Sequence, residues 1–231
     1  MSIPIYIIAY NNLTYVKNMV SQCEKFTTNI HIIDNCSTYP KLLKYYKKDY
    51  PYELLRLTKN IGPRQSIFQL YSMLPNIFVV TDPDLEFSKD LPPDFLDQLL
   101  KISKSYQQFK VGLALDISEP DKYISKKYNG KGYPIEWESQ FWREKVNDDN
   151  YEMYWADIDT TFALYNKEFK PKNFFSSIRV AGSFTCKHLP WYKTCSIQLS
   201  EEELKWYRIE NNASTVYMNY EGISPETNTQ S

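Results

Sequence analysis

The chain has 231 residues, a length that suits one large domain or two small ones. Hydrophobic residues make up 42% of it and charged residues 24%, which is the composition of an ordinary globular protein. A formal net charge of −1 argues against a nucleic-acid binder that works through bulk attraction to phosphates. With only two histidines, a metal site built from several histidines is excluded.

Several common ligand motifs are missing from the sequence. None of the six glycines belongs to a Gly-x-Gly-x-x-Gly, Gly-x-x-x-x-Gly-Lys or Gly-x-Ser-x-Gly segment. The first two would hold the phosphates of a dinucleotide or a nucleoside triphosphate, and the third would carry a serine nucleophile. The sequence therefore disfavours a dinucleotide-dependent enzyme, a P-loop NTPase and a serine hydrolase.

The cysteines and the first residues of the chain indicate the cellular compartment in which the protein is expected. The four cysteines include no Cys-x-x-Cys pair, and a chain of this length can build a core without disulfides. The apolar run at residues 3–9 is too short for a secretion signal or a membrane span. We expect free thiols and a soluble, cytoplasmic protein without a membrane span.

Apolar runs alternate with segments of helical periodicity along the first half of the chain. The expected strands are residues 3–9, 30–34, 53–57, 77–81 and 111–115. The expected helices are residues 13–23, 41–48, 63–71 and a segment that begins near Pro93. Continuous apolar runs are typical of strands buried on both faces. This alternation predicts an α/β fold with a doubly wound open sheet.

Polar residues follow the end of each predicted strand. They are Tyr10-Asn11, Asp34-Asn35, Asn60, Asp82-Pro83-Asp84 and Asp116. In doubly wound sheets the ligand binds outside the carboxyl ends of the strands. The sequence therefore predicts a binding site at this edge of the sheet.

Asp82-Pro83-Asp84 is the segment with the most specific chemistry. Two carboxylates one residue apart at a strand end can share a divalent cation, and oxygen ligands suit Mg²⁺ or Mn²⁺. Such a cation can also hold a diphosphate. The alternative is an ordinary Asp-Pro turn.

With these segments in place, the sequence resembles the GT-A glycosyltransferases, nearest to the family-2 type, from residue 3 to about residue 192. The resemblance lies in four segments that occur in the same order and at similar spacing. They are Ile8-Ala9-Tyr10-Asn11, Ile32-Ile33-Asp34-Asn35-Cys36-Ser37, Asn60-Ile61-Gly62-Pro63-Arg64 and Asp82-Pro83-Asp84. The combination is also similar to small glycosyltransferases encoded by large DNA viruses. It implies a Rossmann-like, nucleotide-sugar-binding open sheet with a smaller acceptor lobe.

The resemblance implies roles for the donor site. Asp34 would bind the base, typically uracil, and Asp84 would ligate the metal. Tyr10 and Asn11 would line the nucleoside, Asn60 and Arg64 would border the pocket, and Asp82 would contact ribose or a metal-bound water. The matched segments add Ala9, Asn35, Ser37, Gly62 and Pro83 to the expected donor site. Asn35 departs from the aspartate usual at its position, which leaves its role open.

The two histidines receive different interpretations. His188 resembles the metal-ligating histidine found late in many GT-A chains, and a neutral imidazole is an acceptable Mn²⁺ ligand beside carboxylates. Its alternative is a hydrogen-bonded structural histidine. His31 lies in a predicted buried strand, where a structural role is expected.

The second half offers candidates for the acceptor side. Residues 153–165 and 178–184 are strand-like, and the first of these segments carries Asp157 and Asp159 in an aromatic setting. Two residues apart on a strand, both would point to one face. One could act as the general base on an acceptor hydroxyl, with Asp157 ahead of Asp159. The alternative is that one of them pairs with Arg179 or caps a turn.

Four aromatic or acidic residues complete the acceptor candidates. Glu138 is the rival for the base. Trp137 and Trp142 could stack on sugar rings, with ordinary core packing as the alternative, and Asp116 could hold the acceptor.

These inferences predict one domain over residues 1–223, with a nucleotide-binding half (1–116), an acceptor-binding half (117–223) and a disordered tail (224–231). The predicted activity is metal-dependent transfer of a sugar, with inversion, from a UDP-sugar to a glycan or other hydroxyl acceptor. A non-catalytic carbohydrate-binding or interaction protein on the same fold is the alternative. A sugar nucleotidyltransferase ranks lower, because residues 10–13 lack the glycine-rich, arginine-containing loop that it needs.

Overall fold

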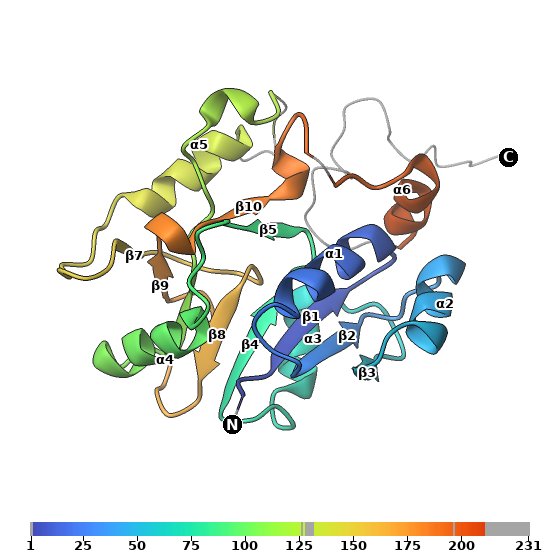
Figure 1. Cartoon of the computed structure of the whole chain (residues 1–231), viewed down its shortest axis with the longest axis horizontal. Coiled ribbons are helices and arrows are strands. Elements are labelled where there is room, and N and C mark those ends of the chain that lie inside the picture. Colours follow the sequence, from blue (N-terminus) through green and yellow to red (C-terminus); the bar gives the residue numbers. More distant parts are fainter. Residues whose placement is uncertain (1, 126, 128–131, 196, 211–231) are drawn as a thin grey trace, which may run out of the picture.

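The computed structural model describes residues 2–125, 127, 132–195 and 197–210. Within them, an eight-stranded sheet has the strand order β3-β2-β1-β4-β8-β6-β9-β7, with helices around it (Figure 1). The predicted fold class, a Rossmann-like α/β open sheet, is confirmed. The strands are β1 (Ile5–Ala9), β2 (Ile30–Asp34), β3 (Glu53–Arg56), β4 (Ile77–Thr81), β6 (Lys110–Leu113), β7 (Met153–Trp155), β8 (Ala163–Asn166) and β9 (Ile178–Val180).

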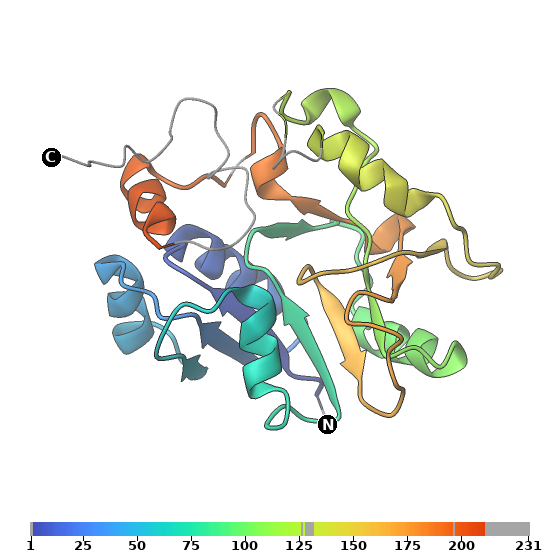
Figure 2. The same cartoon turned by 180° about the vertical axis from the view of Figure 1, so that it is seen from behind.

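The helices lie on both faces of the sheet. They are α1 (Leu13–Cys23), α2 (Pro40–Lys48), α3 (Pro63–Leu70), α4 (Phe95–Ser105), α5 (Pro134–Ser139) and α6 (Glu201–Arg208). Short 3₁₀ turns occur at Pro120–Lys122, Gln140–Trp142, Gly182–Phe184 and Leu189–Trp191. Helix α1 covers one face of the sheet in Figure 1, and α3 covers the other in Figure 2.

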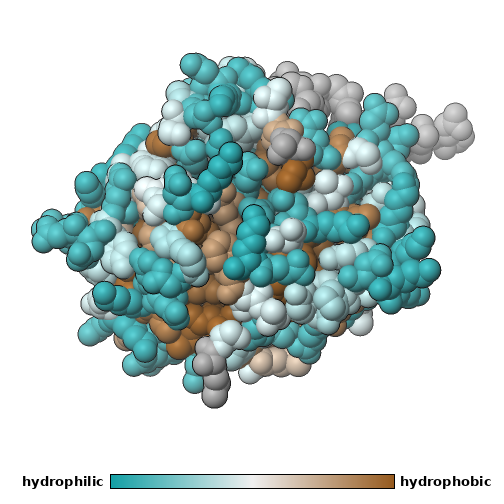
Figure 3. Space-filling view, viewed as in Figure 1, coloured by the Kyte–Doolittle hydropathy of each residue, from teal (hydrophilic) through white to brown (hydrophobic). Residues whose placement is uncertain are grey.

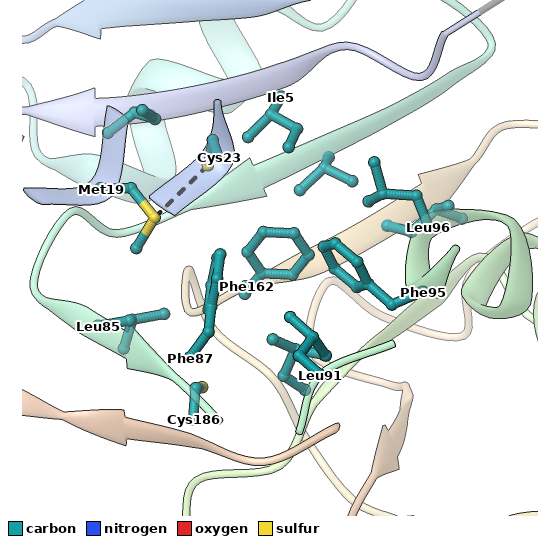
Figure 4. Close-up of a cluster of buried hydrophobic side chains, with 14 of the residues drawn as sticks. Ile5, Met19, Cys23, Leu85, Phe87, Leu91, Phe95, Leu96, Phe162 and Cys186 are labelled. Carbon is teal, nitrogen blue, oxygen red and sulfur yellow. Dashed lines mark hydrogen bonds between the residues drawn. The ribbon is translucent and has the colours of Figure 1, made fainter. Parts of the chain in front are cut away.

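Two hydrophobic clusters follow from the alternation of side chains along the buried strands. Ile5 and Ile7 of β1 belong to the cluster with α1, α2 and α4, whereas Tyr6 and Ile8 belong to the cluster with α3. Figure 4 shows part of the first cluster, where Phe87, Phe95 and Phe162 meet from β5, α4 and the segment before β8. Because both faces are covered, the central strands β1 and β4 are apolar along almost their whole length.

The region 153–165 differs from the sequence expectation. It forms two separate strands, β7 and β8, joined by a loop that contains Asp157 and Asp159. Strand β8 inserts antiparallel between β4 and β6. Gly112 of β6 permits the close approach, since a Cβ there would come within 2.3 Å of the Phe162 carbonyl oxygen. The expectation that both aspartates lie on one face of a strand is therefore wrong.

A small antiparallel ribbon was not predicted. Strands β5 (Leu85–Phe87) and β10 (Cys186–His188) pair so that His188 lies opposite Leu85, next to Asp84. Three residues are too few for a recognisable alternation of side chains. The ribbon brings β10, and with it His188, close to the end of β4.

One face of the described part is largely polar. Figure 3 shows a mostly hydrophilic face with hydrophobic residues gathered in a hollow below its centre. No helix in the described ranges has the length and apolar character needed to cross a bilayer. The predicted tail, residues 224–231, lies outside the described residues. The one-domain interpretation stays a prediction.

Candidate functional site

A cavity of about 500 Å³ lies at the carboxyl ends of β1 and β4, and both halves of the chain line it. From the predicted donor site it includes Ala9, Tyr10, Asn35, Asn60, Arg64, Asp82, Pro83 and Asp84. From the other predicted sites it includes Trp137, Glu138, Asp157, Asp159 and His188. The expected position of a ligand, outside the carboxyl ends of the strands, is where the cavity lies.

Asp84 and His188 form the core of the expected metal site. The β5–β10 ribbon brings Asp84 Oδ2 and His188 Nε2 to 3.4 Å of each other. Two further atoms, Asp84 Oδ1 and His188 Nδ1, are buried and have no hydrogen-bond partner among the described residues. Buried polar atoms without a partner are costly, so their presence here points to a group that binds them.

Electrostatics at this point favour a cation. Burial, and then the charge of Asp84, raise the pKa of Asp82 to about 7, although Thr160 donates a hydrogen bond to Asp82 Oδ2. Burial alone would lower the pKa of His188, but Asp84, Asp82 and Glu138 together raise it. Crowded carboxylates disfavour one another's ionised forms, and a bound cation relieves that repulsion.

The residues present fit a divalent metal held jointly with a phosphate ligand. Among the residues that the structure describes, no group of three or more His, Cys, Asp or Glu is arranged to hold a metal by itself. Mg²⁺, however, is usually bound through one or two carboxylates together with substrate phosphates. Asp84, with its unpartnered oxygen, and His188 would supply the protein ligands.

Helix α6 and the two residues that follow it form one wall of the cavity. Tyr10 donates its hydroxyl hydrogen to the Ile209 carbonyl, and Asn60 Nδ2 donates to the Glu210 carbonyl at 2.7 Å. Tyr207 of α6 also lines the cavity. Helix α6 begins at Ser200, whose hydroxyl accepts a hydrogen bond from the Glu203 amide. No sequence motif had marked this segment as part of the site.

Four predicted donor residues do not line the cavity. The Asn11 side chain accepts hydrogen bonds from the Thr38 and Tyr39 amides, and Ser37 Oγ accepts one from the Asn11 amide. Gly62 has a φ of 82° before α3, where a left-handed residue is needed. In the structure these positions hold the loops in shape, and their contact with a donor stays a prediction.

Asp34 is the fourth of these residues. It is fully buried, lies 3.2 Å from Arg56 Nε, and accepts hydrogen bonds from the Ser37 amide and the Tyr46 hydroxyl. Burial raises its pKa, while Ser37, Arg56 and Tyr46 oppose the rise. Its oxygens are engaged within the protein, so the structure does not place Asp34 as a ligand of the base.

The two aspartates of the 157–159 loop line the cavity but differ in their partners. Both residues are exposed. Arg64 pairs with the Asp159 carboxylate. Among the described residues, no hydrogen bond or ion pair engages the carboxylate of Asp157.

The buried acid at this end of the cavity is Glu138. It forms an ion pair with Arg179, and both side chains are almost completely buried. Burial raises the pKa of Glu138 to about 7, although Arg179 opposes the rise. The guanidinium of Arg179 also lies 4.2 Å from the centre of the Phe141 ring. Because Glu138 is paired, it is a weaker candidate for a base than Asp157.

Of the three predicted acceptor-binding residues, one lines the cavity and two do not. Trp137 lines the cavity and lies edge-to-face with Phe141. Trp142 does not line it and packs on Tyr154, with 5.1 Å between ring centres. Asp116 is also outside the lining, and its backbone carbonyl accepts hydrogen bonds from the Tyr123 and Tyr192 hydroxyls. Only Trp137 keeps its expected place.

Sequence reasoning missed Lys110 and offered Arg179 only as a possible partner of Asp157 or Asp159, whereas Arg179 binds the Asp157 backbone carbonyl and pairs with Glu138. Lys110 and Arg179 both occupy short apolar strands, where a single charged residue gives no local signal of function. Their proximity to the 157–159 loop depends on the pairing of β6 with β9, which only the tertiary structure shows.

No protein-family model matches the chain, and no curated protein matches it. Among solved structures, the chain is similar to the crystal structure of S. aureus TarS 1–349, with a TM-score of 0.43 and 15% identity over 72% of this chain. It spans 47% of that TarS chain, about half of its length. It is also similar to apo UDP-glucose pyrophosphorylase, with a TM-score of 0.45, 12% identity, and coverage of 80% of this chain and 92% of the other. Likenesses this distant identify neither an activity nor a substrate.

Proposed function

We propose that the protein is a metal-dependent glycosyltransferase that takes its sugar from a nucleotide sugar, with a UDP-sugar as the expected donor. The supporting observation is the pair of buried, unpartnered atoms on Asp84 and His188, in a cavity that both halves of the chain line. An acidic cavity edge without a cation would repel a diphosphate. A bound divalent cation would allow the same edge to bind the diphosphate of the donor.

The donor would occupy the side of the cavity formed by the first half of the chain. A divalent metal bound by Asp84 and His188 would neutralise charge on the leaving diphosphate. Tyr10, Asn35 and Asn60 line the side of the cavity next to α6, where they would form the wall against the nucleoside.

The acceptor would occupy the side formed by the second half. Trp137 gives an apolar face on which a sugar ring can stack, and Asp157 gives an ionisable oxygen without a partner among the described residues. The acceptor oxygen forms a bond to the anomeric carbon as the bond to the diphosphate oxygen breaks. The electron pair leaves with the diphosphate, and the hydroxyl proton passes to Asp157. Such a displacement inverts the anomeric configuration.

Calorimetric titration with UDP tests the donor half of the proposal. We expect the wild type to bind UDP in the presence of Mn²⁺ and to lose this binding in EDTA. In Asp84→Asn, Mn²⁺ should no longer increase the affinity for UDP. Asp90→Asn, an exposed aspartate outside the cavity, is the matched control and should bind as the wild type does. Equal UDP affinity with Mn²⁺ and with EDTA would overturn the metal site.

Turnover separates an enzyme from a binding protein. A panel of nucleotide sugars incubated with Mn²⁺ should show release of the nucleoside diphosphate, fastest from one UDP-sugar. Metal-dependent UDP binding without release from any donor would instead support a non-catalytic carbohydrate-binding protein.

A further inference from the structure

Three consecutive backbone carbonyls in the loop between β7 and β8 face two buried cations. Arg179 donates from Nε and Nη2 to the Asp157 carbonyl, at 2.9 and 2.7 Å. Lys110 Nζ lies 2.9 Å from the Ile158 carbonyl and 3.4 Å from the Asp159 carbonyl. The loop is therefore held through its backbone, while its two carboxylates remain exposed in the cavity.

The sheet presents both cations on one face. Arg179 of β9 pairs in register with Gly112 of β6, and Lys110 lies two residues before Gly112 on the same side of the strand. A Cβ at Gly112 would come within 2.8 Å of Ile158 Cδ1, so the glycine makes room for the loop between the two cations. Lys110, Gly112 and Arg179 thus form a cradle for residues 157–159.

Neither cation is free to serve another ligand. The ammonium group of Lys110 also donates to the Phe174 carbonyl and lies 3.8 Å from the centre of the Phe174 ring. Arg179 uses its remaining nitrogen for Glu138. Burying a charge is costly unless hydrogen bonds compensate, and here the compensation comes mainly from the loop carbonyls.

We propose that Lys110 and Arg179 are positioning residues, which hold the backbone of residues 157–159 so that the Asp157 carboxylate faces the acceptor. Arg64 also binds the Asp159 carboxylate, whereas the Asp157 carboxylate has no such side-chain partner among the described residues, so its orientation depends on the backbone of the loop. The kinetic consequence of this inference rests on the proposed transferase activity. Its structural consequence, that the cradle restrains the loop, is independent of that activity.

The kinetic test is a double-mutant cycle of Lys110→Met with Asp157→Asn. Methionine keeps the length and burial of lysine but donates no hydrogen bond. A misplacement of about 1 Å can cost on the order of 10²-fold in rate, so we expect a loss of that size in kcat with an unchanged KM for the donor. In the Asp157→Asn background the same change should have almost no further effect, because the group being positioned is already inactive.

Lys167→Met is the matched control. Lys167 Nζ also donates to two backbone carbonyls, those of Tyr71 and Leu74, and lies 4.3 Å from the centre of the Tyr71 ring. None of these residues lines the cavity. We expect Lys167→Met to leave kcat unchanged in both backgrounds. An equal loss from Lys110→Met in both backgrounds would overturn the positioning role.

Hydrogen exchange tests the cradle without any activity. Peptides that cover residues 156–162 should exchange faster in Lys110→Met than in the wild type, and Lys167→Met should leave them unchanged. If the transferase proposal fails, this measurement still decides whether the cradle exists, since unchanged exchange in Lys110→Met overturns it. Should Lys110→Met not fold, Lys110→Gln, which keeps an amide donor, or Arg179→Lys serves for both tests.

Discussion

Arg64 and Asp159 connect the two halves of the chain across the rim of the cavity. Arg64 Nε and Nη2 donate to the two carboxylate oxygens of Asp159, at 3.1 and 2.9 Å. The guanidinium also lies 4.4 Å from the centre of the Phe175 ring. The start of α3 is thereby tied to the 157–159 loop.

The ion pair of Arg64 and Asp159 should contribute only modestly to the stability of the protein, although it is bidentate. The Arg64 and Asp159 side chains are 42% and 52% exposed, so solvent screens their attraction. We expect Arg64→Gln to lower the free energy of unfolding by about 1 kcal/mol or less in urea denaturation. A loss of several kcal/mol would show that the pair is integral to the fold.

The two loop carboxylates should differ sharply in their effect on transfer. Asp157→Asn should reduce the transfer rate by roughly 10²–10⁴-fold, the usual range for loss of a general base, with UDP affinity unchanged. Asp159→Asn should cause a far smaller loss, because Arg64 already occupies Asp159. Initial rates with a fixed acceptor check this, and NMR of the product should show an inverted anomeric centre. Retained configuration would remove the need for any base.

Removing one partner of the buried pair of Glu138 and Arg179 should cost more stability than removing one partner of the exposed pair of Arg64 and Asp159. Removing one partner leaves an uncompensated buried charge, which typically costs about 3–5 kcal/mol. We expect Arg179→Met to destabilise the protein by roughly that amount in urea denaturation. The double variant Glu138→Leu/Arg179→Met should recover a large part of the loss. No recovery would mean that the hydrogen bonds to the Asp157 carbonyl, not the charge pair, dominate.

Lys110 should make stability depend on pH in an alkaline window. Burial lowers the pKa of Lys110 to about 7 in the folded protein, against 10.5 for a free lysine. Between these values the unfolded chain binds more protons at this position, so the free energy of unfolding should rise with pH. The rise should be measurable from about pH 7 to about pH 9.5, below the titration of unfolded tyrosines near pH 10. Lys110→Met should lack this component, and parallel curves for the two proteins would contradict the assignment.

Asp34 should contribute to stability and not to the choice of base. Asp34→Asn weakens the contact with Arg56 and replaces one acceptor oxygen of a buried group, a change on the order of 1–3 kcal/mol. Because Asp34 does not line the cavity, the ratio of UDP to CDP affinity should stay at its wild-type value. A flattened ratio in calorimetry would restore Asp34 as a ligand of the base.

The sequence predicted the first half of the fold well because its information is local. Strands β2 and β4 and helix α1 have the bounds that the apolar runs and helical spacing indicated. Asp82, Asp84 and Asn60 reached the cavity because the carboxyl ends of parallel strands meet at one edge.

The second half depends on pairings between distant segments. The insertion of β8 between β4 and β6 turned an expected strand into a loop, which moved Asp157 and Asp159 off any strand face. The roles of Lys110 and Arg179 follow from the same insertion. No local pattern of residues encodes which strands become neighbours, so these positions could not be predicted.

The hydrogen bond from Tyr10 to Ile209 joins residues 199 positions apart in the chain. Contacts of such long range are slow to form, because the intervening chain must first lose its freedom. During synthesis the strands of the first half emerge long before α6, so this end of the cavity acquires its wall among the last events of folding. If the proposed function holds, capture of a nucleotide during refolding would therefore report the arrival of α6 rather than the formation of the sheet.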